Sequence, residues 1–222
     1  MAKKKRKIKI GRVCLLFVIA FIVIYFLLKL INFDIKNIYI SGNNVLTDTE
    51  IIEMAGLEDY PSFLTVSNSK ISKKILKNSL VKEVNVYKKN LKSVYIEIVE
   101  NKVLFYNQNI NKLIVSGGNE VDKKISAPTL INYIPDVIYD EFVEKMDLID
   151  SNILSMVSEI KYDVNEVDDE RFLFYMEDGN YVYLTLSKLD KINSYQSIIK
   201  KFGNKKGIMY LDSGEYFKVV EN

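Results

Sequence analysis

The stretch VCLLFVIAFIVIYFLL, residues 13–28, decides how this chain is organised. Sixteen apolar residues follow one another, and only Lys29 separates them from Leu30 and Ile31. An apolar run of about nineteen residues makes about 28 Å of helix, close to the thickness of a bilayer's hydrocarbon core. A buried helix of a soluble domain normally keeps a polar stripe, and this run has none. Residues 13–31 are therefore predicted to form a transmembrane helix.

Charges on either side of this helix predict its orientation. Residues 1–12 carry seven basic residues and no acidic one, whereas Asp34 follows the apolar run. The positive-inside rule makes residues 1–12 a cytoplasmic tail and places the chain from about Phe33 outside. A cleaved signal peptide also starts with basic residues, but its apolar segment is shorter, and KLINFD, residues 29–34, lacks a small-x-small cleavage pattern. We expect a single-pass type II membrane protein.

Composition argues against several function classes for the part outside the membrane. Seven of the 31 basic residues precede the apolar run, which leaves 24 against 29 acidic residues, a net charge of about −5 that does not suit nucleic acid. The chain has no histidine, and its single cysteine, Cys14, lies inside the apolar run. The commonest general base and metal ligands are therefore missing, and no phosphate-binding loop or nucleophile elbow occurs. Asp168, Asp169 and Glu170 form the densest acidic cluster, which is typical of a solvated loop. We expect no catalytic residue, cofactor, metal, nucleic acid or small-molecule substrate.

Residues 33–100 show the pattern of a small domain. Thr47 and Glu50 make a capping box at the start of a helix, and Gly56 ends that helix. Residues 94–98 alternate between apolar and other side chains, which indicates a strand with one buried face. The expected order is strand, helix, helix, strand, strand: a strand at 38–40, a helix between Thr47 and Gly56, a helix at 69–78, and two antiparallel strands around 84–88 and 93–100.

Residues 101–222 predict a mixed α/β domain dominated by an antiparallel sheet, so the fold class of the whole chain is α+β. Ser187 is expected to cap one helix whose apolar face extends from Leu189 to Phe202 and which ends at Gly203. The other expected elements are a meander at 103–106, 112–115 and Val121, one or two helices within 137–157, strands near 160–164, 172–176 and 181–185 with a hairpin turn at 177–180, and final strands at 208–211 and 215–219.

The order of elements in residues 33–100 resembles a POTRA domain, and the chain is similar to the FtsQ/DivIB family of bacterial cell-division proteins. The segment IYISGNNVLTDTEIIEMAGL, residues 38–57, resembles the start of that family's POTRA domain. The segment GIMYLDSGEYF, residues 207–217, matches the Gram-positive pattern of its C-terminal β domain. The departures are Leu91 and Val103 where proline is usual, Ala127 where leucine is usual, and Tyr210 where aspartate is common.

The resemblance implies a non-enzymatic scaffold of the division septum that helps assemble or regulate septal peptidoglycan synthesis. It also implies that the β domain, residues 101–222, binds FtsL-like and FtsB/DivIC-like partners outside the membrane. Strand addition to an exposed edge is the physical route, with side chains giving specificity. The expected partner-binding residues are Tyr210, Leu211, Asp212, Gly214, Tyr216 and Phe217.

Three other interpretations remain open at this point. The aromatic residues of the last strands are also typical of a sheet core. An anchored enzyme or sensor would need polar groups that converge in a deep cleft. A translocation chaperone would be expected to carry tandem POTRA copies or a β-barrel, whereas this chain has one POTRA-like segment.

Overall fold

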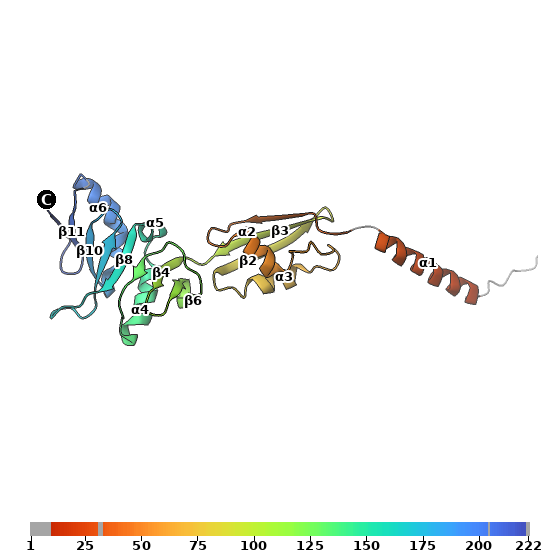
Figure 1. The fold of residues 1–222 in the computed structure, drawn as a ribbon, viewed down its shortest axis with the longest axis horizontal. Helices are drawn as coiled ribbons and strands as arrows, with labels where there is room; N and C mark the ends of the chain where they lie inside the picture. Colours follow the sequence, from red (N-terminus) through yellow and green to blue (C-terminus); the bar gives the residue numbers. More distant parts are fainter. Residues whose placement is uncertain (1–9, 31–32, 204, 221–222) are drawn as a thin grey trace, which may run out of the picture.

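The computed structural model describes residues 10–30, 33–203 and 205–220, with side chains at 11, 13–27 and throughout the two later ranges. The molecule is elongated (Figure 1). Helix α1 lies at one end, a three-stranded sheet with two helices lies in the middle, and a nine-stranded sheet lies at the other end with the C-terminus. The predicted cytoplasmic tail, residues 1–12, falls mostly outside the described residues.

Helix α1, Ile10–Leu30, has 21 residues and covers most of the predicted transmembrane segment. Its described side chains from Val13 to Leu27 are exposed, and Phe17 and Phe21 expose 72% and 75% of their surface. Within the residues that the structure describes, no helix is both long and apolar enough to cross a membrane. The transmembrane helix therefore stays a prediction from the sequence.

The middle unit has the predicted order of strand, helix, helix, strand, strand. Strand β3 lies between β1 and β2, parallel to β1 and antiparallel to β2. Both helices contribute to a core that also contains the inward side chains of the sheet, such as Val94, Ile96 and Ile98. The elements are β1 Asn37–Ser41, α2 Asp48–Ala55, α3 Asn68–Ile75, β2 Val81–Lys89 and β3 Ser93–Glu100.

The capping box of α2 is confirmed. The Thr47 hydroxyl accepts a hydrogen bond from the amide of Glu50 at 3.2 Å, and the Glu50 carboxylate accepts one from the amide of Thr47 at 2.8 Å. Gly56 ends the helix at φ 67°, in the left-handed region that glycine adopts without strain. Helix α3 begins one residue before the expected start and ends at Ile75, three residues before the expected end.

The second unit is built on one mixed sheet in the order β12-β11-β10-β9-β8-β7-β4-β5-β6. The α+β class with a large sheet is confirmed. Most neighbours are antiparallel, but β7 is parallel to β4 and β8, and β11 is parallel to β10. The elements are β4 Val103–Asn107, β5 Lys112–Val115, η1 Ser116–Gly118, β6 Asn119–Val121, β7 Thr129–Leu130, α4 Asp136–Asp147, α5 Ser151–Leu154, β8 Val157–Tyr162, β9 Arg171–Met176, β10 Tyr181–Thr185, η2 Leu186–Ser194, α6 Tyr195–Lys201, β11 Gly207–Tyr210 and β12 Tyr216–Val219.

The prediction of one α-helix capped by Ser187 is wrong. Residues 186–194 form the 3₁₀ segment η2, with a kink at Lys188, and α6 follows it. The buried side chains Leu186, Leu189, Ile192 and Tyr195 are spaced three apart, and a 3₁₀ helix of three residues per turn places that spacing on one face. Leu189, Ile192 and Tyr195 were expected on the apolar face and are buried, but Leu186 was not expected there, and the period of three was assigned to the wrong helix type.

The two units are joined by direct contacts as well as by the chain. Leu113 and Val115 of β5 are fully buried in the same apolar cluster as the core of the middle unit. The Lys123 ammonium also binds across the junction, to the Glu50 carboxylate and to the Val45 carbonyl, at 2.8 and 3.0 Å. The hydrogen bond from Lys123 and that from the Thr47 amide lower the pKa of Glu50 to about 2.

Candidate partner-binding surface

Strand β12 is the last strand of the large sheet, and among the described residues it pairs with β11 alone. Gly207 allows this pairing, because a Cβ at that position would lie 2.3 Å from the Lys218 carbonyl oxygen. No residue larger than glycine fits there without moving β12. One side of β12 therefore carries main-chain groups that have no partner strand.

The register shows which residues of β12 turn their main-chain groups outward. The amide of Val220 donates to the carbonyl of Lys206 at 3.0 Å, so these two residues form a hydrogen-bonded pair. Hydrogen-bonded and non-hydrogen-bonded pairs alternate along an antiparallel ladder, and the next residue pair is Gly207 with Val219. The amides and carbonyls of Phe217 and Val219 therefore point away from β11, toward the open edge.

A row of tyrosines crosses the face of the sheet that lies opposite the helices. The rings of Tyr183 and Tyr210 lie 5.3 Å apart, and those of Tyr210 and Tyr216 lie 4.7 Å apart, both stacked. Tyr216 is 52% exposed, and Tyr181, on the same face, is 41% exposed. Helices α4 and α6 and segment η2 contribute to the core on the other face, with Phe172, Phe174, Val182 and Met209. The open edge of β12 is thus bordered by an aromatic, partly exposed surface.

Arg171 on β9 fixes the end of this row and the turn that leads into β12. Its Nε donates to Asp212 at 2.8 Å, one of its terminal nitrogens donates to Asp163 at 3.2 Å, and its guanidinium lies 3.6 Å from the centre of the Tyr183 ring. Burial by itself would raise the pKa of Asp212, but the hydrogen bonds from Arg171 and Ser213 outweigh burial and lower that pKa. Lys188 adds a hydrogen bond to the Asp212 carbonyl at 2.8 Å.

The structure separates the six expected partner-binding residues into two groups. Tyr210 and Tyr216 lie on the open face, and Gly214 lies in the turn between their strands. Leu211 is 2% exposed and belongs to the core, and Phe217 packs against that core and against Phe202, with ring centres 4.9 Å apart. The side chain of Asp212 is held by Arg171. These placements do not test binding, so the roles of the six residues stay predictions.

Sequence reasoning missed Arg171 and Tyr183 as parts of this surface. Tyr183 was assigned to a strand, and Arg171 precedes the strand expected at 172–176. Their place beside Tyr210 depends on β10 pairing in parallel with β11, which brings Tyr183 opposite Tyr210. Alternation along β10 did carry a usable signal, because Tyr181 and Tyr183 alternate with the buried Val182 and Leu184. That alternation does not predict that β11 is the strand beside β10.

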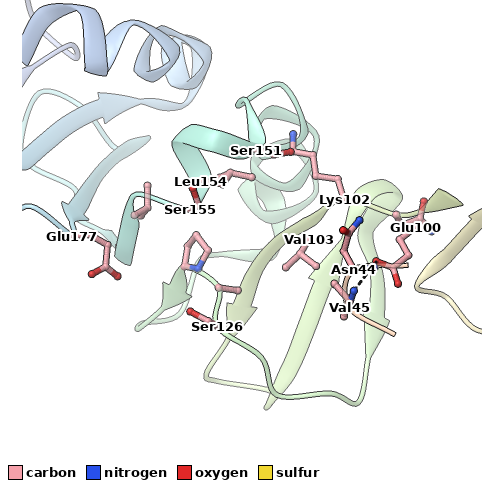
Figure 2. A pocket seen from close by; sticks show the side chains of 14 residues that line it. Asn44, Val45, Glu100, Lys102, Val103, Ser126, Ser151, Leu154, Ser155 and Glu177 are labelled. Carbon is pink, nitrogen blue, oxygen red and sulfur yellow. Dashed lines mark hydrogen bonds between the residues drawn. The ribbon is translucent and has the colours of Figure 1, made fainter. Parts of the chain in front are cut away.

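A cleft of about 610 Å³ lies at the junction of the two units (Figure 2). Its wall includes Glu100, whose carboxylate accepts hydrogen bonds from the amides of residues 44–46 at 2.8 to 3.0 Å, and Lys102, which donates to the Asp147 carbonyl. Figure 2 shows Glu177 on the opposite side from these two residues. Among the described residues that line this cleft, no hydrogen bond joins a serine to a carboxylate or a lysine.

Comparison with known proteins gives consistent matches. The family model "POTRA domain, FtsQ-type" matches residues 33–101. The chain is 29% identical to "Cell division protein DivIB" of Listeria monocytogenes over 231 residues, which is 97% of this chain and 85% of that protein. It is 27% identical to the protein of the same name from Bacillus subtilis over 228 residues, which is 97% of this chain and 87% of that protein. A solved structure of the major extracytoplasmic domain of DivIB from Geobacillus stearothermophilus aligns with 47% of this chain and 96% of that domain, with 19% identity and a TM-score of 0.37.

Proposed function

Because this chain belongs to the FtsQ/DivIB family of bacterial cell-division proteins, we propose that it is a non-enzymatic scaffold of the division septum. It binds FtsL-like and FtsB/DivIC-like proteins outside the membrane and thereby helps assemble or regulate septal peptidoglycan synthesis. The observation that carries this proposal is the open edge of β12 beside the row formed by Tyr183, Tyr210 and Tyr216.

An edge strand of this kind binds a partner by accepting one further strand. The outward main-chain groups of Phe217 and Val219 supply the hydrogen bonds, and the exposed ring of Tyr216 supplies apolar contact area and selects the partner sequence. Tyrosine is enriched among the residues that dominate binding energy at protein interfaces. An extended segment of a division partner is the ligand that suits this surface.

Binding of the full chain in detergent to the extracytoplasmic segments of its FtsL-like and DivIC-like proteins tests the proposal. Tyr216→Ala should weaken binding roughly tenfold, as expected for an interface tyrosine. Val219→Pro removes an outward amide without removing a hydrogen bond to β11, so it should abolish strand addition and leave the thermal unfolding temperature nearly unchanged.

Tyr39→Ala is the matched control, because Tyr39 is a 49% exposed tyrosine on the sheet of the other unit. Equal weakening by Tyr39→Ala and Tyr216→Ala would show that the effect is not specific to β12. Failure of the unmodified chain to bind either partner segment would overturn the scaffold proposal.

We also propose that α1 anchors the protein in the cell membrane with the N-terminus in the cytoplasm. The proposal is supported by the apolar run of residues 13–28 and by the exposure of its described side chains in α1, since exposed apolar area of that extent needs a cover. A polarity-sensitive fluorophore on Cys14, the only cysteine, tests the anchor after reconstitution into lipid vesicles. Emission typical of water would contradict it.

A further inference from the structure

Two loops at the α1 end of the middle unit expose large apolar side chains. One loop joins α2 to α3 and carries Tyr60 and Leu64, which are 46% and 59% exposed, and the other joins β2 to β3 and carries Leu91, which is 56% exposed. Figure 1 shows both loops at the end of the sheet that faces α1, away from the large sheet. We call Tyr60, Leu64 and Leu91 the proximal rim.

Main-chain hydrogen bonds hold both loops against the segment that leads from α1 into β1. The amide of Phe63 donates to the carbonyl of Phe33 at 2.8 Å, and the amide of Lys36 donates to the carbonyl of Lys92 at 2.8 Å. The proximal rim therefore begins where the chain leaves α1. Its position is fixed by the fold and does not depend on loose loops.

Chain length restricts the rim to the neighbourhood of the helix end. Only residues 31 and 32 separate Leu30, the last residue of α1, from Phe33. Three steps of 3.8 Å between successive Cα atoms reach at most about 11 Å. The polar headgroup layer on each side of a bilayer is roughly 5 to 8 Å thick. With α1 in the membrane and Leu30 at the edge of the hydrocarbon core, Phe33 lies within about 11 Å of that edge, so side chains beside Phe33 are close enough to contact the headgroup layer.

Backbone geometry gives an independent reason to assign the rim a role. Leu91 has φ 55° and Tyr60 has φ 48°, in the left-handed region that residues with a side chain adopt at a cost. Glycine would suit the Leu91 position of this hairpin turn better, since the turn follows Asn90, which also has φ 55°. A strained position that carries an exposed leucine is not explained by the stability of the domain.

From these observations we infer that the proximal rim inserts into the outer lipid surface of the membrane that holds α1, with Leu64 and Leu91 among the upper acyl chains and Tyr60 among the headgroups. Tyrosine and leucine both suit this interfacial position. The inference rests on the proposed membrane anchor. It adds a second membrane contact that fixes how the extracytoplasmic units stand on the bilayer.

The charges around the rim indicate that the contact is apolar. Three exposed lysines and three exposed acidic residues lie in the rim loops and in the segment before β1. The half-buried Lys88, which donates to the carbonyls of Phe63 and Val66, leaves a net charge of about +1, so attraction to anionic lipids is at most a small part of the driving force. Docking should therefore differ little between low and high salt. The charged residues are Lys36, Lys89, Lys92, Asp34, Glu58 and Asp59.

Single fluorophores on the full chain test the inference. In a Cys14→Ser background, Leu64→Cys and Leu91→Cys variants each receive a polarity-sensitive fluorophore and are reconstituted into phosphatidylcholine vesicles that contain a lipid with a quencher on its acyl chain. We expect blue-shifted emission and quenching at both positions. Val167→Cys, a 96% exposed position in the large-sheet unit, is the matched control and should show neither effect.

A second variant separates docking from folding. Leu91→Gly removes the apolar side chain and suits the positive φ, so the domain should stay folded. The fluorophore at Leu64→Cys should then report a roughly tenfold lower ratio of docked to undocked molecules, as expected for the loss of one buried leucine. Quenching that is unchanged by Leu91→Gly would overturn the assignment of Leu91.

The fluorophore on Cys14 distinguishes failure of the inference from failure of the anchor. Water-like emission at Leu64→Cys and Leu91→Cys, with Cys14 in lipid, would overturn the inference and leave the anchor intact. Water-like emission at all three positions would overturn both. A shift at the rim that occurs only after addition of division partners would identify the rim as a protein-binding site instead.

Discussion

Arg171 connects three separate stretches of the large sheet. It binds the carboxylates of Asp163 and Asp212, and it covers the ring of Tyr183. Arginine suits this task because its planar guanidinium donates in two directions and stacks on an aromatic face at the same time. The guanidinium and the Asp212 carboxylate are largely withdrawn from solvent, with side-chain exposures of 13% and 8%. Loss of either partner would leave a poorly hydrated charge.

We predict that Arg171→Ala lowers the free energy of unfolding by about 3 kcal/mol, because it leaves the buried Asp212 charge unpaired. Urea denaturation measures the change. Because the pKa of Asp212 is lowered in the folded protein, the pair contributes fully to the free energy of unfolding at pH values above the ordinary aspartate pKa. This contribution declines as the pH falls below the ordinary aspartate pKa.

The Asp163→Asn and Asp212→Asn variants are the controls for Arg171→Ala. Asp212→Asn should cost more than Asp163→Asn, since the Asp163 side chain is more exposed than that of Asp212, at 23% against 8%. A change below about 0.5 kcal/mol for Arg171→Ala would mean that the pair adds little to the fold.

Which of two adjacent aromatic residues faces the core could not be read from the sequence. Tyr216 and Phe217 must point to opposite faces of a strand, but either ring suits a core or a binding surface. The structure resolves this through Met209, which is buried and lies opposite Phe217 in the register. The role of Asp212 was equally hidden, because its partner Arg171 lies 41 residues away along the chain.

At the scale of elements, β12 depends on one close approach between strands. A Cβ on Gly207 would lie 2.3 Å from the Lys218 carbonyl oxygen and 2.7 Å from the Phe217 ring. Position 207 of β11 requires glycine because there is no space for a Cβ. The nearest atom is the main-chain oxygen of Lys218, which cannot move aside as a flexible side chain can. The glycine in the sequence pattern at residues 207–217 thus has a steric reason.

We predict that Gly207→Ala separates β12 from β11 at a cost of about 2 kcal/mol, the range for an overpacked site. Hydrogen exchange should accelerate at the amides of Tyr216 and Lys218, which face β11, with little change in β8 and β9. Gly214→Ala is the control, because its Cβ would meet only the Tyr216 ring, at 3.2 Å, and should have a smaller effect. Equal exchange rates in both variants would contradict the steric argument.

Local sequence patterns predict most of the helices and strands, but they do not predict which strands pair with each other. The capping box at Thr47 and the alternation of residues 94–98 depend on neighbours in the chain, and the structure confirms them. The parallel pairings of β1 with β3 and of β10 with β11 join segments that are far apart, and hydrophobic alternation does not specify a partner strand. An exposed edge with Tyr210 and Tyr216 was expected, but the place of Tyr183 beside them was not.

At the scale of the whole molecule, the two units outside α1 form a continuous body. Leu113 and Val115 belong to the expected meander of the second domain, and their side chains also lie in the apolar cluster of the middle unit. Composition and periodicity indicated two units but could not show this shared core. An apolar side chain in the sequence indicates burial, but it does not indicate which unit's core buries it.

We predict that acid loosens the junction between the units. The hydrogen bond from Lys123 lowers the pKa of Glu50 to about 2, so the interaction is complete above the ordinary glutamate pKa and is lost as the pH falls toward 2. The effect should be at most about 1 kcal/mol, because Glu50 is 41% exposed. Carboxyl NMR titration should show a higher pKa of Glu50 in Lys123→Met. An unchanged Glu50 pKa in that variant would exclude the cross-junction pair in solution.

The shared core at the junction has a mechanical consequence. Leu113 and Val115 pack into the middle unit, and Lys123 binds Glu50, so the body from β1 to β12 keeps a fixed length. The distance from β1 to the open edge of β12 is then set by the chain itself. If β12 takes up a partner strand as we propose, that strand is held at this distance from β1, and a pull on β12 is transmitted to β1 through the shared core.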